Sequence, residues 1–123
     1  MLIRSQDKER LMDFTRASVG IDHGESDEND IWITMMYSER DYGMLGRYSN
    51  EQKALKVMDM IQEAYADFES TKITSTGLAT AAYTGSYDTP ESVSHGIKVL
   101  KEYTELIKSA VIFQMPDDRN VKV

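Results

Sequence analysis

One stretch of the chain has residue types suited to ligand binding: residues 70–89, which read STKITSTGLATAAYTGSYDT. It is almost uncharged and keeps neither a helical nor a strand period, so we interpret it as a long irregular connector. Its tyrosines offer flat faces on which a base can stack, and its hydroxyl and carboxylate groups suit ribose-like partners. The alternative is that the tyrosines only fill the gap between two helix ends, or that the stretch continues a helix by a turn or two. The candidate binding residues are Tyr83, Thr84, Ser86, Tyr87 and Asp88.

Three basic side chains are candidates for holding a phosphate. His95 falls near the start of an expected helix, where the helix dipole and free N–H groups favour an anion. An exposed surface histidine is the alternative. Arg4 and Arg119 lie near the two ends of the chain and would grip a phosphate together if the terminal strands are neighbours. Solvated arginines at strand ends are the default interpretation.

No residue set for catalysis can be recognised in the sequence. The P-loop, G-x-G-x-x-G and G-x-S-x-G motifs do not occur. There is no cysteine, and the two histidines are His23 and His95, so disulfides, Cys-ligated zinc, a thiol nucleophile and a His-rich metal site are excluded. We therefore expect a protein that is not an enzyme, with no cofactor and no metal.

The charge is strongly negative, with 14 Lys and Arg against 21 Asp and Glu and a net charge of -7. This balance disfavours general binding to DNA or RNA. Residues 22–30, DHGESDEND, are the most acidic segment, but their spacing does not match an EF-hand calcium loop. We interpret this segment as a solvated loop.

Hydrophobic patterning predicts the elements that position these candidates. Short apolar or β-branched runs predict strands, and two long stretches with apolar residues at spacings of three and four predict amphipathic helices. The predicted strands are residues 1–4, 11–14, 18–21, 31–37, 42–48 and 111–115, and the predicted helices are residues 50–69 and 90–109.

Both helices have start signals. Ser49 and Gln52 form the S-x-x-Q pattern of a capping box, and Pro90 follows a cap residue at position 88 or 89. The expected fold is one α+β domain over residues 1–123: a small antiparallel N-terminal sheet, two antiparallel amphipathic helices packed on one face of that sheet, and a C-terminal strand that returns to it. The apolar stripe of the second helix comprises Val93, Ile97, Leu100, Thr104 and Ile107.

Three segments resemble a widespread type of small phage protein from bacteria of the Firmicutes kind: IRSQDK, LGRYSNEQKALKVMDMIQ and VIFQMPDD. They cover about a third of the chain. Most such proteins are shorter, with one helix leading almost directly into the final strand. The longer build, a small N-terminal sheet with two long helices, resembles the phage Thoeris anti-defence proteins. Those proteins oligomerise and sequester a cyclic ADP-ribose signal made by TIR-domain enzymes, and some relatives also bind cyclic oligonucleotides.

The resemblance implies a phage anti-defence protein that sequesters a nucleotide-derived immune signal without cleaving it, as a dimer or higher homo-oligomer. The second hypothesis is an acidic inhibitor whose carboxylates imitate nucleic acid and block a host nuclease or another defence effector. The N-terminus is charged by residue 4 and no long apolar run occurs. We therefore expect a cytoplasmic protein, in the host cell if phage-encoded, that binds neither a membrane nor nucleic acid.

Overall fold

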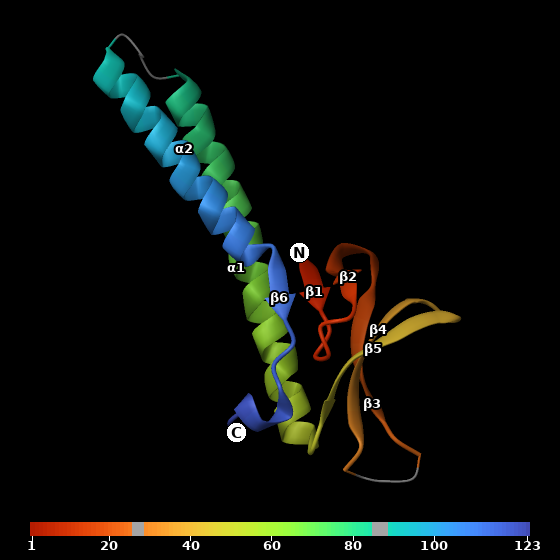
Figure 1. The fold of residues 1–123 in the computed structure, drawn as a ribbon. Coiled ribbons are helices and arrows are strands. Elements are labelled where there is room, and N and C mark those ends of the chain that lie inside the picture. The colour runs from red at the N-terminus through yellow and green to blue at the C-terminus, as the bar shows by residue number, and fades with distance from the viewer. Residues whose placement is uncertain (26–28, 85–88) are drawn as a thin grey trace.

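The computed structural model describes the backbone of residues 1–25, 29–84 and 89–123, and their side chains except those of 78–84. Within these residues the predicted α+β fold is confirmed: two small three-stranded sheets are combined with two long helices (Figure 1). In chain order the elements, with η for short 3₁₀ helices, are β1 Leu2–Arg4, β2 Leu11–Asp13, η1 Phe14–Arg16, β3 Ser18–His23, β4 Ile31–Ser38, β5 Asp41–Tyr48, α1 Glu51–Thr84, α2 Pro90–Ala110, β6 Ile112–Gln114 and η2 Asp118–Asn120.

The first sheet joins the two ends of the chain, with the strand order β2-β1-β6. β1 and β2 are antiparallel, whereas β6 runs parallel to β1 with Phe113 opposite Ile3. The return of the C-terminal strand to the N-terminal strands is therefore confirmed. Between β1 and β2 the chain turns through Lys8, whose φ of 66° lies in the left-handed region.

The second sheet is an antiparallel meander of β3, β4 and β5. The sequence predicted a single sheet, but the chain leaves β2 through η1, in which the Thr15 backbone N–H donates to the Asp13 carboxylate. This turn redirects the chain before β3, so the later strands form a separate sheet. β4 and β5 make the predicted hairpin, with Trp32 paired to Arg47.

The helix α1 is much longer than predicted, because it continues from residue 69 to Thr84. The prediction that residues 70–84 form an irregular connector is therefore wrong. Hydroxylated residues weaken helix propensity, but local bonding and tertiary packing override that preference here. The Thr76 hydroxyl donates to the Lys72 carbonyl (2.8 Å), and Ser75 is buried. Residues 70–84 thus form one helix of a helix pair.

The cap of α1 is also displaced from the predicted position. The Asn50 side-chain oxygen accepts the Lys53 backbone N–H at 2.9 Å, so Asn50 caps the helix. Ser49 instead donates its backbone N–H and its hydroxyl to the Asp118 carboxylate, at 2.8 and 3.0 Å. The Ser49 capping box is therefore wrong, because a distant carboxylate takes the Ser49 donors.

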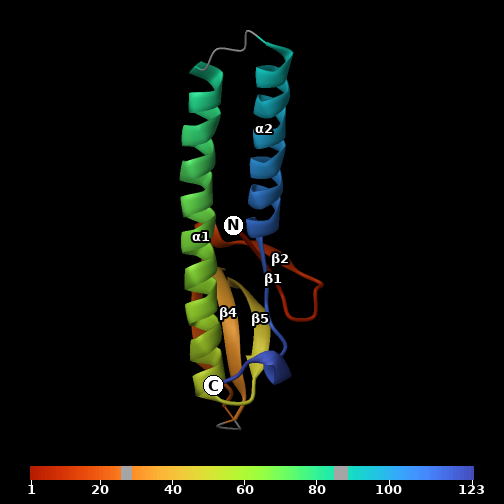
Figure 2. The same ribbon diagram turned by 90° about the vertical axis from the view of Figure 1, so that its left-hand side faces the viewer.

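The start of α2 agrees with the sequence. Thr89 is the N-cap and Pro90 begins the helix, with a capping box between Thr89 and Ser92. α2 runs antiparallel to the second half of α1, and this hairpin extends beyond the sheets (Figures 1 and 2). Only the first half of α1 lies against the strands, which differs from the expected packing of both helices on one sheet face.

The core lies between the first half of α1 and the inner faces of the strands. It is built from aliphatic and methionine side chains with one tyrosine and one phenylalanine, and half-buried residues such as Phe14 and Tyr65 close one side. No helix in the described part of the chain is long and apolar enough to cross a membrane. The buried apolar residues are Met1, Ile3, Ile31, Ile33, Met35, Leu45, Tyr48, Ala54, Val57, Ile61, Phe68, Met115 and Val121.

Candidate ligand-binding site

The structure tests little of the site predicted at residues 83–88. Tyr83 and Thr84 lie in the last turn of α1, but their side chains are outside the described ones. Ser86, Tyr87 and Asp88 fall outside the described residues altogether. Binding by these five residues stays a prediction, now for the tip of a helix hairpin.

The three predicted basic residues are placed separately. His95 is exposed on α2. Arg4 is exposed at the end of β1, and its Nε donates to the Lys8 carbonyl at 3.2 Å. Arg119 lies in η2, pairs with Asp117 at 3.6 Å and has a side chain 86% exposed. β1 and β6 are neighbours as expected, yet among the described contacts none joins Arg4 to Arg119.

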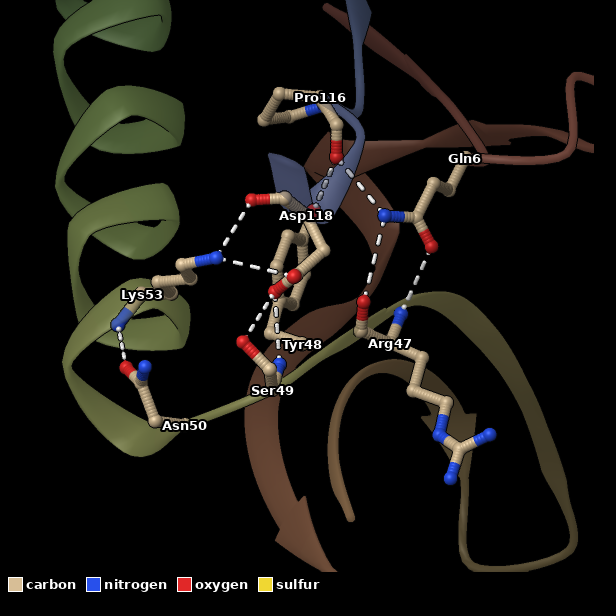
Figure 3. Close-up of polar contacts among 8 residues, drawn as sticks. All are labelled: Gln6, Arg47, Tyr48, Ser49, Asn50, Lys53, Pro116 and Asp118. Atoms are coloured by element: carbon tan, nitrogen blue, oxygen red, sulfur yellow. Dashed lines mark hydrogen bonds and ion pairs between the residues drawn. The ribbon is translucent and has the colours of Figure 1, made fainter. Parts of the chain in front are cut away.

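A polar network ties both chain ends to the start of α1 (Figure 3). Gln6, in the turn after β1, is its first member. The Gln6 side-chain oxygen accepts the Arg47 N–H at 3.0 Å, while its amide nitrogen donates to the carbonyls of Pro116 (3.0 Å) and Arg47 (3.4 Å). One amide group therefore fixes the backbone of β5 at Arg47 and the chain after β6.

Tyr48 and Asp118 complete this network. The buried Tyr48 hydroxyl donates to the Pro116 carbonyl at 3.0 Å, and burial raises its pKa, so it remains a donor at all physiological pH values. Asp118 accepts two hydrogen bonds from Ser49, and its carboxylate forms an ion pair with the Lys53 ammonium group at 3.0 Å. The hydrogen bond from the Ser49 backbone, with the Lys53 contacts, lowers the pKa of Asp118.

The three segments that carry the phage-protein resemblance meet in this network. Gln6 belongs to IRSQDK, the residues from Arg47 to Lys53 belong to LGRYSNEQK, and Pro116 and Asp118 belong to VIFQMPDD. Side chains of these three segments form hydrogen bonds and an ion pair with one another and with the backbone. These contacts stabilise the fold. Figure 3 also shows the Arg47 guanidinium pointing away from the hydrogen bonds of the network.

A hollow of about 360 Å³ lies beside Arg47, where the β1–β2 turn meets β4 and β5. Trp32 and Arg47 form one wall, with the guanidinium carbon of Arg47 5.5 Å from the centroid of the indole ring. This distance is typical of a cation–π contact. The hollow is lined by Gln6, Asp7, Arg10, Trp32, Met44, Leu45, Gly46 and Arg47.

Arg10 brings a second guanidinium to the same hollow. A Cβ atom at Gly43 would lie 3.5 Å from the Arg10 Nη1, an ordinary contact distance, so the Arg10 side chain reaches β5 at this position. The same Cβ would lie 3.2 Å from the Met12 methyl, a tighter approach. Asp7 is the carboxylate in the lining, and a hydrogen bond from the Ser5 hydroxyl lowers its pKa. The lining of the hollow therefore contains two arginines and one aspartate.

A smaller set of residues extends the site around Arg47. A second hollow, also about 360 Å³, is lined by Asn29, Arg47, Tyr48, Ser49 and Asp118. Arg47 is common to both hollows, and its Nε forms an ion pair with Asp30. Its side chain remains 59% exposed. The Asp30 side chain is only 23% exposed, so the ion pair is solvent-accessible on its Arg47 side.

The sequence contained a signal for this pair that the motif search missed. A hairpin closed by the two residues Glu39 and Arg40 pairs Ser38 with Asp41. The register shifts by one between Met36 and Ser38 and shifts back between Ile33 and Thr34, so Trp32 lies opposite Arg47 as a regular hairpin would place it. Side chains on directly paired positions lie on the same face of the sheet. Extending the predicted hairpin register would have found the pair, whereas Arg10 joins it only through the tertiary fold.

The acidic segment is partly engaged within the chain. Asp22 accepts a hydrogen bond from the Thr34 hydroxyl at 2.7 Å, and Asp30 pairs with Arg47. Asp27 and Glu28 fall outside the described residues. Among the side chains the structure describes, no cluster of three or more potential metal ligands occurs.

Comparison of the chain with protein-family models, curated proteins and solved structures finds no match in any of the three.

Proposed function

We propose that this protein is a phage anti-defence protein that captures a nucleotide-derived immune signal, of the cyclic ADP-ribose or cyclic oligonucleotide type, without cleaving it. The observation that carries the proposal is the hollow lined by Trp32, Arg47 and Arg10, in which the Arg47 guanidinium lies over the Trp32 indole. This combination suits a ligand with a planar ring and phosphates. Capture alone silences a signal, so the proposal needs no catalytic group.

The chemistry of the hollow divides into two parts. The indole of Trp32 and the thioether of Met44, which is 48% exposed, offer an apolar surface for a base. Base–aromatic stacking is worth about 1–3 kcal/mol per base. Arg10 and Arg47 offer charge-assisted, fork-shaped donors for phosphate oxygens. A chain with a net charge of -7 binds an anion only where its arginines are gathered, as they are here.

The polar network supports this site from behind. Gln6 lines the hollow and also holds both backbone polar groups of Arg47. The guanidinium therefore projects from a fixed point of β5, which reduces the conformational entropy that binding would cost. The phage-protein segments in this way supply the frame of the site.

Calorimetry with cyclic ADP-ribose isomers and cyclic dinucleotides tests the proposal. We expect one of these ligands to bind, and Arg47→Gln to weaken binding about tenfold or more because a charged phosphate contact is lost. The matched control is Arg40→Gln, which removes an exposed arginine from the β4–β5 turn outside the hollow. Heating the complex should release the ligand intact.

Three results would contradict the proposal. They are an absence of heat for every ligand, equal loss of affinity in Arg47→Gln and Arg40→Gln, and recovery of a cleaved ligand.

A further inference from the structure

The outer edge of β3 has no neighbouring strand among the described residues, because β3 ends the sheet order β3-β4-β5. The Gly24 N–H donates to the Asp30 carbonyl at 2.7 Å, which continues the β3–β4 register by one hydrogen-bonded pair. In an antiparallel ladder the backbone groups of alternate residues point to opposite sides, so those of Gly20 and Asp22 face β4. The N–H and C=O groups of the intervening residues point outward, and no described residue hydrogen-bonds to them: Val19, Ile21 and His23.

The other strand edges are covered or short. Gln6 covers part of β5, because its backbone N–H donates to the Leu45 carbonyl at 2.7 Å and its side chain binds both backbone polar groups of Arg47. β2 and β6 have three residues each. Short length, bulges, proline and lysine commonly protect an edge against pairing. β3 has six residues, a regular register with β4, and neither proline nor lysine, so its edge can accept another strand.

A groove of about 350 Å³ lies between the start of β3 and α1, which runs along this sheet (Figure 2). The rings of Phe14 and Tyr65 lie 5.1 Å apart in its wall. Asp59 is the charged residue of the lining, is exposed, and has no hydrogen bond or ion pair with any described residue. The apolar part of the lining consists of Phe14, Ala17, Val19, Met58, Ile61 and Tyr65.

We propose that the edge of β3 and this groove bind an extended peptide segment of another protein, which adds a further strand to the sheet. The peptide backbone pairs with the outward N–H and C=O groups of β3, and every second side chain points toward the groove. The apolar lining accepts one large apolar side chain. Asp59 pairs with a lysine or arginine two positions from that side chain, since residues two apart lie on the same face of a strand.

The charge of the groove favours a basic peptide over a second copy of this chain. The net charge of -7 and the unpaired Asp59 both attract a cationic segment. A second copy that paired through its own β3 would contribute SVGIDH, which contains neither lysine nor arginine. It would leave both Asp59 carboxylates without a cation. The groove shares no lining residue with the hollow of Trp32 and Arg10, so this inference does not depend on the proposed ligand.

Hydrogen exchange in the free protein, measured by NMR, tests the edge itself. The backbone amides of Gly20 and Asp22 should exchange slowly because they face β4. The amides of Val19, Ile21 and His23 should exchange faster because they face solvent. An exchange pattern without this alternation would overturn the proposal.

Selection from a displayed library of random nonapeptides supplies the peptide for the binding test. We expect the selected peptides to share a large apolar residue with a lysine or arginine two positions away. The synthetic form of such a peptide should slow exchange at the amides of Val19, Ile21 and His23 by about tenfold or more. A failure to select any peptide, or a bound peptide that slows none of these amides, would overturn the proposal.

A charge reversal tests the role of Asp59. Asp59→Lys should weaken binding of the selected peptide about threefold or more, because an exposed ion pair is replaced by repulsion. Asp67→Lys is the matched control, since Asp67 is an exposed carboxylate of the same helix outside the groove. Both variants should keep the helix content of the wild type by circular dichroism.

The peptide provides the second half of this test. Replacing its basic residue by glutamine should remove the difference in affinity between the wild type and Asp59→Lys. Equal effects of the substitutions at Asp59 and Asp67, or a difference that persists with the uncharged peptide, would contradict the pairing.

Discussion

Asp118 shows how a single side chain near the C-terminus fixes the start of a helix far away in sequence. It receives both donors of Ser49 and the ammonium group of Lys53. Ser49 thereby stops being a helix cap, and Asn50 takes that role. The sequence pattern at residues 49–52 predicted a helix cap but not which residue forms it. The Asp118 carboxylate, which competes for the Ser49 donors, lies 69 residues further along the chain.

Asp118→Asn should destabilise the protein at neutral pH. Its side chain is 36% exposed, so solvent screening limits the expected loss to about 1 kcal/mol. The pKa of Asp118 is lowered in the folded state, so its contribution is complete above the unfolded pKa of about 3.9 and is lost as the pH falls through the folded value. Urea unfolding at a series of pH values measures this dependence.

The control is Asp117→Asn, which removes only a 3.6 Å pair with the largely exposed Arg119 and should change stability little. If Asp118→Asn loses the same stability at pH 3 as at pH 7, the assigned role of the carboxylate is wrong.

At the scale of elements, the predicted strands and helix starts agree with the structure more closely than the predicted end of α1 does. The β4–β5 hairpin and α2 carry strong local signals: alternating β-branched residues in one, and Thr89 with Pro90 in the other. Residues 70–84 carry none, since serine and threonine are weak helix formers. Their helical state depends on α2 packing beside them, which is long-range information.

A substitution at Ser75 tests whether residues 70–84 pack against α2. It is 7% exposed, and among the residues that the structure describes none hydrogen-bonds its hydroxyl oxygen. Ser75→Ala should therefore stabilise the protein by about 1 kcal/mol, through loss of an unsatisfied buried hydroxyl and better helix propensity. Thermal and urea unfolding provide the measurement.

Ser70→Ala is the matched control, because Ser70 is an exposed serine of the same helix and gains only propensity. A larger gain at position 70 than at position 75 would show that Ser75 is not packed at a helix interface.

At the scale of the whole molecule, the two chain ends, the start of α1 and the β4–β5 hairpin converge on Arg47. Gln6 and Arg47 belong both to the polar network with Tyr48 and Asp118 and to the lining of the hollow with Trp32 and Arg10. The α+β class and the return of the C-terminal strand could be predicted from local patterns. The hollow could not, because Arg10 reaches it only through the packing of one sheet against the other.

The helix hairpin forms a second region, separate from this site. The end of α1 in this hairpin holds Tyr83 and Thr84, and α2 carries the exposed side chains of Val93, Ile97 and Leu100.

The fluorescence of Trp32 tests the proposed binding site most directly, since it is the only tryptophan of the chain. Titration of the wild type with cyclic ADP-ribose isomers and cyclic dinucleotides should give a saturable change with one ligand, because the base stacks on the indole. The Arg10→Gln, Arg47→Gln double variant should lose that change while keeping its fold. No change with any ligand, or the same saturable change in the double variant, would contradict the proposed site.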